Sequence, residues 1–594
     1  MPFVRLCQSR CGRLWLALCA ALLCAPSLSV GLLLDDYFLL SRLRDADGGL
    51  RWLGLRDAFA FFPRGEAASL QQQGLLGWWV DPQVALSFFR PLSALSHALD
   101  FQWLTDAPWL MHAESIALML ALHLSVGQLY ARWFGAAPRA LALAYLLYIL
   151  SPGHAVVASW LANRNACLAA LFGVWALWSF ERAAQGKGAR YHGATCLGLL
   201  LSLLSGELGT STFVLLAAHA WCIDAAPWPV RLRALLAPLL LLASWLVVYR
   251  ALGFGTAHVQ LYLDAVAAPW DFVCALGLRA PQLIFAQLYL PIASLSLMLS
   301  GKASLVASLV CGCAIAPWLP SVLEVCRHDA RARFCAAASL GSLLPIAASV
   351  PHDRLLLFAD IGGAGLIASL VHHLSSMPSR RARVLRLSVA SHLGASLLLG
   401  PAYAASLHAQ AATADVPFRA LKDEEALANQ TLVFVNLPSC YFAANFDWQL
   451  RGSGRPSPQR MLCLAPGIYP LRVARMDAHT LRVRASHGVL QPWGTWRGDS
   501  GTEAGPLSAV YMAQALNLEG DARPLSRGET LRVGHVSVTA HAWTPEGYPS
   551  EVHFRFDAPL DSPSLRFVAW QGRALLPFTL PKVGEEVALL PILL

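Results

Sequence analysis

The 594-residue sequence has few charged residues: Asp, Glu, Lys and Arg make up only 14% of it, against about a quarter in a typical soluble domain. It is 56% hydrophobic, with a mean hydropathy of +0.49. A soluble core cannot bury that much apolar sequence, so we expect a polytopic membrane protein. The net charge of +9 does not indicate a nucleic-acid partner, because the basic residues cluster in short loops between apolar segments.

Three other features are missing. The 14 cysteines show no metal-ligand spacing, since Cys311 and Cys313 lie in one apolar run and would point to different faces of a helix. No glycine-rich loop is present that could hold the phosphates of a nucleotide. No internal repeat is visible, although many transporters are built from two similar halves. The sequence therefore does not favour a nucleotide-dependent enzyme or a two-fold transporter.

Long apolar runs are what the sequence has instead. Segments of roughly 17–25 apolar residues can cross a bilayer as helices, and we expect about 11 of them. They lie near 14–34, 109–131, 139–157, 165–181, 191–205, 208–223, 234–253, 303–323, 334–350, 355–374 and 387–407. The first is interpreted as an uncleaved helix, because it is longer than the apolar part of a signal peptide. The region 272–299 contains Pro281 and Pro291 and is expected to form a re-entrant or kinked segment.

The loop charges give these helices an orientation. Six basic clusters, from Arg5–Arg13 to Arg380–Arg386, fall on every second loop and therefore on one side. Basic loops stay in the cytoplasm. We therefore expect a multi-pass protein of the plasma (inner) membrane with a cytoplasmic N-terminus and an extracytoplasmic C-terminus.

Two outer regions follow from this map. The first outer loop, 35–108, contains an apolar spacing that predicts an amphipathic helix, with Phe88, Leu92, Leu95 and Leu99 on one face. Two tryptophan patches in this loop, Trp78–Trp79 and Trp103–Trp109, are typical of a membrane interface. They are assigned with the loop to a transmembrane domain, 1–408.

The remaining segment, 415–594, alternates apolar and polar residues between turn residues, which predicts a soluble all-β domain outside the membrane. Its only cysteines are Cys440 and Cys463. They form a disulfide if the compartment is oxidising, or else two buried thiols.

Candidate catalytic residues begin with the acid pair Asp35–Asp36, directly after the first apolar run. Neighbours on a helix point about 100° apart, so at most one of the two faces a given cleft. That carboxylate could act as a general base, while a helix cap or a solvated helix end is the structural alternative.

Other polar residues lie at the expected outer ends of helices. A buried arginine there can bind a phosphate through two hydrogen bonds, but a snorkelling arginine or a surface ion pair is the alternative. The candidates are Arg90, His112, His154, Arg164, Glu207, Asp353 and Arg354.

Taken in chain order, an acid pair, FRP, a histidine and P-x-H-x-x-x-x-x-W-x-x-x-R resemble the membrane glycosyltransferases of the C fold. The resemblance is to the protein O-mannosyltransferase-like branch and covers about residues 14 to 407. It rests on Asp35, Asp36, Arg90, Pro91, His112, Pro152, His154, Trp160 and Arg164. The sequence departs from the family at Gly206, Ser115 and Leu355–Leu357, so a non-catalytic relative stays open, as does a transporter or flippase of a lipid-linked glycan.

The resemblance implies transfer of a sugar from a polyprenyl-phosphate donor to an acceptor hydroxyl on the extracytoplasmic side, with inversion at the anomeric carbon. Asp35 or Asp36 would be the base. Arg164, Arg354, Arg90 and His154 would bind the donor phosphate, and His112, Glu207 and Asp353 are further candidates. No cofactor is named; a divalent metal is left open, without a clear ligand set. The expected partners are the lipid-linked donor, membrane lipid and an acceptor of unknown class.

Overall fold

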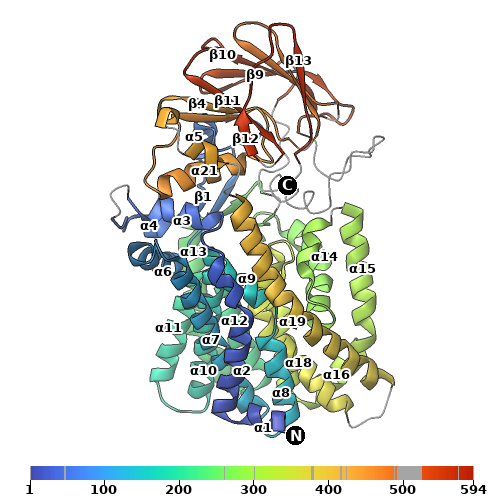
Figure 1. The fold of residues 1–594 in the computed structure, drawn as a ribbon. Coiled ribbons are helices and arrows are strands. Elements are labelled where there is room, and N and C mark those ends of the chain that lie inside the picture. The colour runs from blue at the N-terminus through green and yellow to red at the C-terminus, as the bar shows by residue number, and fades with distance from the viewer. Residues whose placement is uncertain are drawn as a thin grey trace.

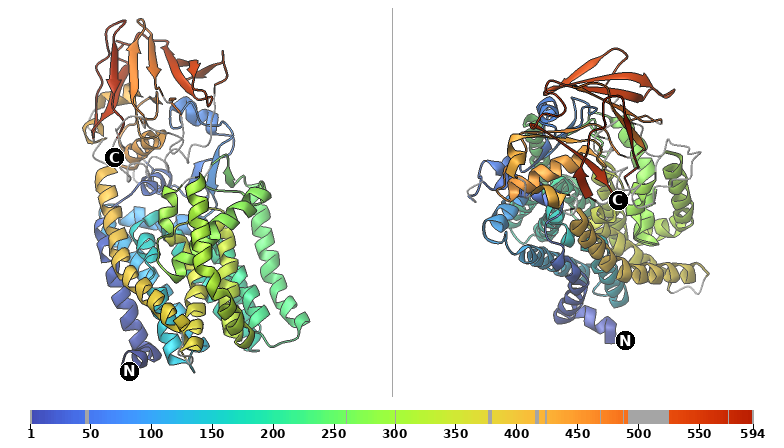
Figure 2. Two further views of the ribbon diagram at one scale, coloured as in Figure 1. Left: turned by 90° about the vertical axis from the view of Figure 1, so that its right-hand side faces the viewer. Right: turned by 45° about the horizontal axis from the view of Figure 1, so that its top comes forward.

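The computed structural model of the chain describes residues 2–45, 49–259, 261–299, 301–375, 380–414, 418–422, 425–467, 469–486, 488–490, 525–572 and 574–592. A long bundle of helices carries a β-rich C-terminal domain on one end (Figure 1). The N-terminus lies at the opposite end of the bundle, which is also plain in the side view of Figure 2.

The bundle helices follow the apolar segments of the sequence. In chain order they are α1 (Pro2–Gln8), α2 (Arg10–Leu23), α7 (Pro108–Trp133), α8 (Pro138–Ile149), α9 (Gly153–Ser159), α10 (Arg164–Ala184), α11 (Arg190–Ser205), α12 (Thr210–Cys222), α13 (Trp228–Ala251), α14 (Pro269–Leu288), α15 (Gly301–Ile315), α16 (Leu319–His328), α17 (Ala330–Ala347), α18 (Ala359–Leu374) and α19 (Arg380–Ala414).

Among the described residues, five helical segments are long and apolar enough to cross a membrane. They are Pro108–Trp133, Leu161–Ala184, Trp228–Ala251, Lys302–His328 and Arg380–Ala412. A sixth is α8 with α9, if these helices, which bend by 41°, count as one span. By length and composition the bundle is therefore a membrane domain.

The expected number of 11 crossings is not confirmed. Three of the expected spans form α11, α12 and α18, which have 16, 13 and 16 residues. The first expected span, 14–34, is wrong as a continuous helix, because α2 ends at Leu23 and the 3-10 turn Ala25–Ser29 follows. Pro26 explains this break, since proline lacks an N–H and disfavours the α conformation in the residue before it.

The region 272–299 is not a single crossing of the bundle, because the chain turns back after α14. Gln282 on α14 donates a hydrogen bond to Ser308 Oγ on α15 (2.6 Å), and Tyr289, at the end of α14, donates to Ala314 O (2.7 Å). Both helices advance in the same direction between these two contacts. They are therefore parallel neighbours, and the chain between them returns to the end from which α14 began.

The first outer loop forms its own small elements. They are α3 (Asp35–Leu43), α4 (Gly54–Asp57), β1 (Phe59–Phe62), α5 (Ala67–Gln73), β2 (Ala85–Phe88) and α6 (Pro91–Trp103). The expected amphipathic helix corresponds to α6 only in part, because Phe88 lies in β2 and Leu99 is 38% exposed. The face that α6 buries contains Ala94, Ala98 and Phe101 instead. β2 pairs antiparallel with β1 on one side and with β3 (Gly255–Ala257), which follows α13, on the other.

The C-terminal domain combines two sheets with helices. One sheet has six antiparallel strands in the order β13-β6-β7-β10-β9-β8, and the other has the order β12-β11-β4-β5, with β4 parallel to both neighbours. The elements are α20 (Arg419–Lys422), β4 (Thr431–Phe434), α21 (Cys440–Gly452), β5 (Arg460–Cys463), β6 (Leu471–Arg475), β7 (Thr480–Arg484), β8 (Thr530–Val533), β9 (Val536–Trp543), β10 (Pro549–Phe556), β11 (Leu565–Gln571), β12 (Ala574–Pro577) and β13 (Glu586–Leu589).

The prediction of an all-β domain is wrong at α21, which connects β4 to the parallel strand β5. Its buried residues Phe442, Phe446 and Leu450 recur every four positions, which is a helical period. Ser439 caps the helix, because its side chain accepts a hydrogen bond from the Tyr441 N–H. A parallel pair needs such a crossover, and this one places α21 next to the first outer loop.

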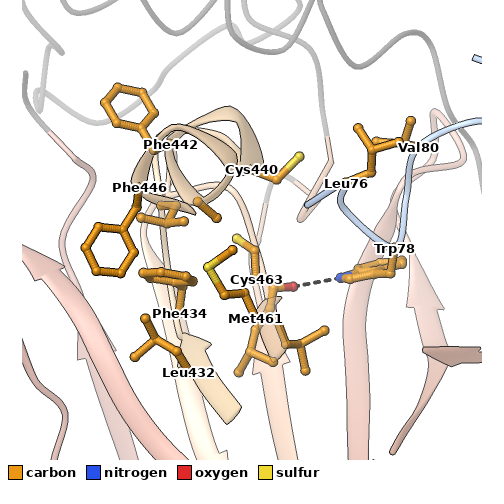
Figure 3. Packing of buried hydrophobic residues seen from close by; sticks show 14 of the residues in the cluster. Leu76, Trp78, Val80, Leu432, Phe434, Cys440, Phe442, Phe446, Met461 and Cys463 are labelled. Carbon is orange, nitrogen blue, oxygen red and sulfur yellow. Dashed lines mark hydrogen bonds between the residues drawn. The ribbon is translucent and has the colours of Figure 1, made fainter. Parts of the chain in front are cut away.

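The first outer loop and the C-terminal domain share one hydrophobic core (Figure 3). Trp78 is 1% exposed, and its Nε1 donates to the carbonyl oxygen of Leu464 (3.0 Å). The prediction that Trp78 and Trp79 lie at a membrane interface is wrong, because both are buried in this core. The two domains inferred from the sequence are therefore packed together through the loop.

Cys440 and Cys463 also lie in this core (Figure 3). No disulfide joins them, so the structure corresponds to the alternative with two buried thiols. The Gly77 N–H donates to Cys440 Sγ (3.0 Å), which ties the first outer loop to the start of α21.

Candidate functional site

A cavity of about 530 Å³ lies where the bundle, the first outer loop and the C-terminal domain meet. Its walls come from segments far apart in the sequence: the start of α3, strands β1 and β2, the end of α13, the connection 255–266, and the segment 345–355. Aromatic rings cover much of the wall. They belong to Phe59, Phe61, Phe62, Phe88, Trp160, Trp245, Tyr249, Tyr262 and Tyr441.

Asp35 lines this cavity, at the first position of α3. The preceding residue, Leu34, has φ of 42°, a left-handed conformation that few residues other than glycine adopt. Asp35 Oδ1 accepts a hydrogen bond from the Tyr441 hydroxyl (2.6 Å). Burial raises the pKa of Asp35, while this hydrogen bond and the charges of Arg354 and Arg90 oppose the rise. The site thus holds a partly desolvated carboxylate at a strained turn.

Asp36 has a different environment from its neighbour. It is fully buried and does not line the cavity. Its Oδ2 accepts the Leu33 N–H (2.9 Å) and its Oδ1 accepts the Ala162 N–H (2.8 Å). Burial raises the pKa of Asp36 to about 8 against these two hydrogen bonds. Asp36 therefore joins the turn before α3 to the segment before α10, and Asp35 is the acid of the pair that faces the cavity.

Arg90 and Glu207 form an ion pair in the cavity wall. Arg90 Nε and Nη2 both lie 2.7 Å from Glu207 Oε2. The guanidinium also stacks on Phe88, with its carbon 4.2 Å from the ring centre. The Tyr249 hydroxyl donates to the other Glu207 oxygen (3.3 Å). Arg90 is thus held flat against an aromatic wall, with its charge balanced by one carboxylate.

Arg354 is the cavity arginine without an ion pair. Its Nη1 donates to Asn163 Oδ1, and its guanidinium stacks on Trp160, with its carbon 4.9 Å from the ring centre. Within the described part of the chain no carboxylate lies within ion-pair distance of it, although Asp35 is near enough to act on its pKa. Burial lowers the pKa of Arg354. The ordinary pKa of arginine is so high that the side chain stays charged nevertheless.

Three nitrogen donors around Arg354 have no acceptor among the described residues. They are Arg354 Nε, Asn163 Nδ2 and Trp160 Nε1. A buried donor without a partner costs about 1–3 kcal/mol, so each such group calls for an explanation. All three atoms are covered in the structure, so an oxygen acceptor would reach them only after a small shift of a side chain.

Not all charged side chains of the cavity are in ion pairs with one another. Its lining contains three arginines and three carboxylates: Arg90, Arg250, Arg354, Asp35, Glu207 and Asp264. Arg90 pairs with Glu207, and Arg250 pairs with Asp264 through both oxygens. Asp35 and Arg354 are left as a carboxylate and a guanidinium that face the same space without an ion pair in the described structure.

Arg164 lies outside this cavity, in the core of the bundle, and is 0% exposed. Each of its three nitrogen atoms has an acceptor. Nη1 pairs with Asp100 (2.6 Å), Nε donates to Ser115 Oγ (3.0 Å), and Nη2 donates to Met111 O (2.8 Å). These bonds join α10 to α6 and α7. Each nitrogen of Arg164 thus already has a partner inside the bundle.

The two predicted site histidines are also in the interior, away from the cavity. His112 Nε2 lies 2.8 Å from Gly31 O, and its Nδ1 lies 3.1 Å from Ala158 O. His154 Nδ1 lies 2.9 Å from His123 Nε2. These contacts join α7 to the turn before α3 and to α9, which is a structural role.

Asp353 precedes Arg354 but points away from the cavity. Its Oδ2 accepts hydrogen bonds from Ser294 Oγ (2.6 Å) and the Tyr403 hydroxyl (3.1 Å), and its Oδ1 accepts the Ala293 N–H (3.1 Å). Asp353 thus fastens the turn that carries Arg354 to α19 and to the return segment after α14.

Of the nine predicted site residues, the cavity brings together Asp35, Arg90, Glu207 and Arg354. Tyr441, Tyr249 and Asn163 were missed. Asn163 adjoins the predicted Arg164, but Tyr441 lies more than 400 residues from Asp35 and carried no signal. In the part of the chain that the structure describes, no group of three His, Cys, Asp or Glu side chains is placed to hold a metal ion.

No protein-family model and no curated protein matches the chain. Solved structures that are similar include ArnT from Cupriavidus metallidurans bound to undecaprenyl phosphate, at 11% identity and a TM-score of 0.36, over 74% of this chain and 84% of that one. The same protein in the apo state is 13% identical with a TM-score of 0.34, over 71% of this chain and 83% of that one.

Proposed function

We propose that the chain is an integral membrane glycosyltransferase of the C fold. In this proposal it transfers a sugar from a polyprenyl-phosphate donor to an acceptor hydroxyl in the cavity. The observation that carries the proposal is the pair of unmatched charges: Asp35 and Arg354 face one cavity, and neither is neutralised by an ion pair among the described residues. A reaction that moves a proton from a hydroxyl and leaves a phosphate needs one base and one fixed cation.

The reaction is a single displacement. Asp35 takes the proton of the acceptor hydroxyl, and the acceptor oxygen forms a bond to the anomeric carbon of the sugar. The bond between that carbon and the phosphate oxygen breaks, and its electron pair leaves with the polyprenyl phosphate. Attack opposite to the leaving group inverts the anomeric carbon. Asp35 suits the first step because its pKa is raised toward that of a useful base.

Arg354 is the residue that would hold the leaving phosphate. A fixed guanidinium stabilises charge as it develops and needs no reorganisation during the reaction. The donors without acceptors on Arg354, Asn163 and Trp160 are consistent with an oxygen-rich anion as the missing partner. Arg90 would give weaker support, because Glu207 already balances its charge.

The lipid part of the donor fits the other end of the cavity. Residues from α13, from the connection before α14 and from the segment around residue 345 make that part of the wall apolar: Trp245, Leu246, Val266, Pro345, Ile346 and Ala348. Leu246 and Val266 are also 45% and 79% exposed on the outside. An apolar chain could thus extend from the cavity toward the surrounding bilayer.

The proposal places the cavity on the extracytoplasmic side of a plasma (inner) membrane. Support comes from the basic residues at the other end of the bundle. Arg13 lies there with Gln128, and Arg132 pairs with Glu181 near the loops that carry the other basic clusters. Basic residues favour the cytoplasmic side, and the β-rich domain would then cover the cavity from outside.

The test is a donor-consumption assay on the full chain in lipid vesicles. Wild type, Asp35→Asn and Asp57→Asn are mixed with a panel of polyprenyl-phosphate sugars, and release of polyprenyl phosphate is measured. We expect Asp35→Asn to slow release by about 10²–10⁴-fold, as for loss of a general base. Asp57 is the control acid, because it is half exposed and lies outside the cavity.

Two results contradict the proposal. If Asp35→Asn releases polyprenyl phosphate as fast as wild type, Asp35 is not the base. If wild type is inert with every donor although it binds them, a non-catalytic relative or a transporter of a lipid-linked glycan becomes the better explanation. Vesicles with a labelled lipid-linked glycan inside would then separate those two alternatives.

A further inference from the structure

In the described part of the C-terminal domain, helix α21 is the element that reaches the cavity. Three contacts dock α21 on the start of α3. The Tyr441 hydroxyl donates to Asp35 Oδ1, Asn445 Nδ2 donates to Leu34 O (3.3 Å), and the rings of Phe38 and Trp448 lie 4.8 Å apart. The site therefore includes a side chain from outside the membrane domain.

The backbone and the ring of Tyr441 are both held in place by contacts other than the one with Asp35. Its backbone N–H donates to the Ser439 side chain (3.1 Å), which caps α21. Its ring packs edge-on against Trp448, with centres 5.5 Å apart. A side chain held in this way places its hydroxyl with little freedom, so the 2.6 Å bond to Asp35 is a built contact.

The hydrogen bond from Tyr441 gives the two carboxylate oxygens of Asp35 different environments. Oδ1 is occupied by Tyr441, while no protein group among the described residues donates to Oδ2. A phenol that donates to a carboxylate favours its charged form. The contact therefore fixes the plane of the carboxylate and keeps one oxygen ready to accept a proton.

We propose that Tyr441 is the positioning residue for Asp35, through which the C-terminal domain completes the site in the membrane domain. The part of this inference that concerns the base rests on the proposed function. The contact between α21 and α3 does not. Tyr441 gives up no proton in the reaction; it acts only on the orientation and proton affinity of Asp35.

The experiment measures the protonation of Asp35 directly. The apolar reagent dicyclohexylcarbodiimide reacts with protonated carboxyl groups, and mass spectrometry of the peptide that contains Asp35 reports its modification. Wild type and Tyr441→Phe are labelled as full chains in lipid vesicles over a range of pH. Tyr403→Phe is the matched control, because it removes a tyrosine hydroxyl from another aspartate, Asp353, outside the cavity.

Without the hydroxyl, only the charges of Arg354 and Arg90 oppose the effect of burial on Asp35, so its pKa should rise. We expect the midpoint of labelling to move to higher pH by about one unit in Tyr441→Phe, which is the size of one hydrogen bond to a charged group. Tyr403→Phe should keep the wild-type midpoint. If a donor is turned over, the acid limb of kcat should move up by the same amount, with KM for the donor unchanged.

An unchanged midpoint in Tyr441→Phe overturns the inference, and so does a failure of Asp35 to react at any pH, which would deny the open Oδ2. Should Tyr441→Phe not fold, 3,5-difluorotyrosine at position 441 keeps the ring and strengthens the donor, and it should move the midpoint to lower pH. Because labelling needs no sugar donor, a shift without turnover would preserve the role of Tyr441 while the proposed function fails.

Discussion

Arg164 and Arg354 lie in two regions that differ in how fully they supply hydrogen-bond acceptors to an arginine. Around Arg164, in the bundle, all three guanidinium nitrogens find acceptors on α6 and α7. Around Arg354, in the cavity, the described residues offer no acceptor to its Nε, to Asn163 Nδ2 or to Trp160 Nε1. Among the described residues, only the guanidinium of Arg164 has an acceptor for each of its nitrogen atoms.

This difference in hydrogen-bond partners indicates that one arginine contributes to stability and the other to ligand binding. A buried charge with all its partners contributes to the fold, and loss of one partner leaves the others stranded at a large cost. A donor without a partner costs free energy in the empty protein, and a ligand oxygen can recover it. We therefore expect substitutions around Arg164 to change the free energy of unfolding, and substitutions around Arg354 to change the affinity for a phosphate.

The largest effect should follow from Arg164→Met. The substitution leaves the carboxylate of Asp100 buried without its cation, and such breaks cost about 3–5 kcal/mol. Thermal unfolding in detergent, followed by the amount of monodisperse protein, should show a large fall in Tm or failure to fold. The double variant Arg164→Met/Asp100→Leu removes both charges and should recover part of the loss. An unchanged Tm in the single variant would contradict the structural role of this network.

Arg354→Gln should have the next largest effect, but on binding. Removal of the cation should cost about 2 kcal/mol or more of binding free energy for polyprenyl phosphate, which is at least about 30-fold in Kd. The Tm should change little, because Arg354 has no ion pair to lose in the described structure. Titration with polyprenyl phosphate, with Arg56→Gln as the exposed control, measures both quantities. Equal affinity in both variants would remove Arg354 from the phosphate site.

The contrast between the two arginines could not be read from the sequence. Both follow an apolar run and stand near aromatic residues, so both looked like phosphate ligands. What distinguishes them is the charge of the partners that lie far away in the chain: Arg164 pairs with the carboxylate of Asp100, whereas Arg354 has the amide of Asn163 and no carboxylate within ion-pair distance among the described residues. The order of apolar runs, the β-rich tail and four of the cavity residues could be predicted, since each depends on local patterns or on helix ends.

Local patterns also misled where a tertiary contact decided the outcome. Trp78 is of a residue type that is common at membrane interfaces, yet it is buried against the C-terminal domain. The helical period of α21 was hidden between strand-like segments. Asp35 and Asp36 are alike in sequence, and only the path of the chain after Leu34 decides which one faces the cavity.

Asp36→Asn sharpens the comparison within the acid pair. Because burial raises the pKa of Asp36 to about 8, the folded chain keeps a proton that the unfolded chain loses above about pH 4. The free energy of unfolding should therefore fall as the pH rises through this window. Asp36→Asn cannot release that proton, so its Tm should fall less between about pH 5 and pH 8.

The same variant should be less stable at the lower pH by about 1–3 kcal/mol, because its amide nitrogen meets one of the two backbone N–H donors. Asp35→Asn, which keeps both of those donors matched, is the control and should not share this loss. Parallel Tm curves for wild type and Asp36→Asn across the pH range would show that Asp36 is ionised in the folded chain.

The smallest effect should distinguish two tryptophans whose indole N–H groups have different partners. Trp160 Nε1 has no acceptor in the described part of the chain, whereas Trp78 Nε1 donates to Leu464 O. Phenylalanine at either position removes the N–H and some ring volume. At position 78 it also strands a carbonyl, so Trp78→Phe should lower stability by about 1–3 kcal/mol. At position 160 the loss of packing is offset by the loss of a stranded donor, so Tm should change by less, and affinity for polyprenyl phosphate should fall only several-fold. If Trp160→Phe is the less stable of the two, its N–H has a partner in solution, and the cavity around Arg354 is as complete as the network around Arg164.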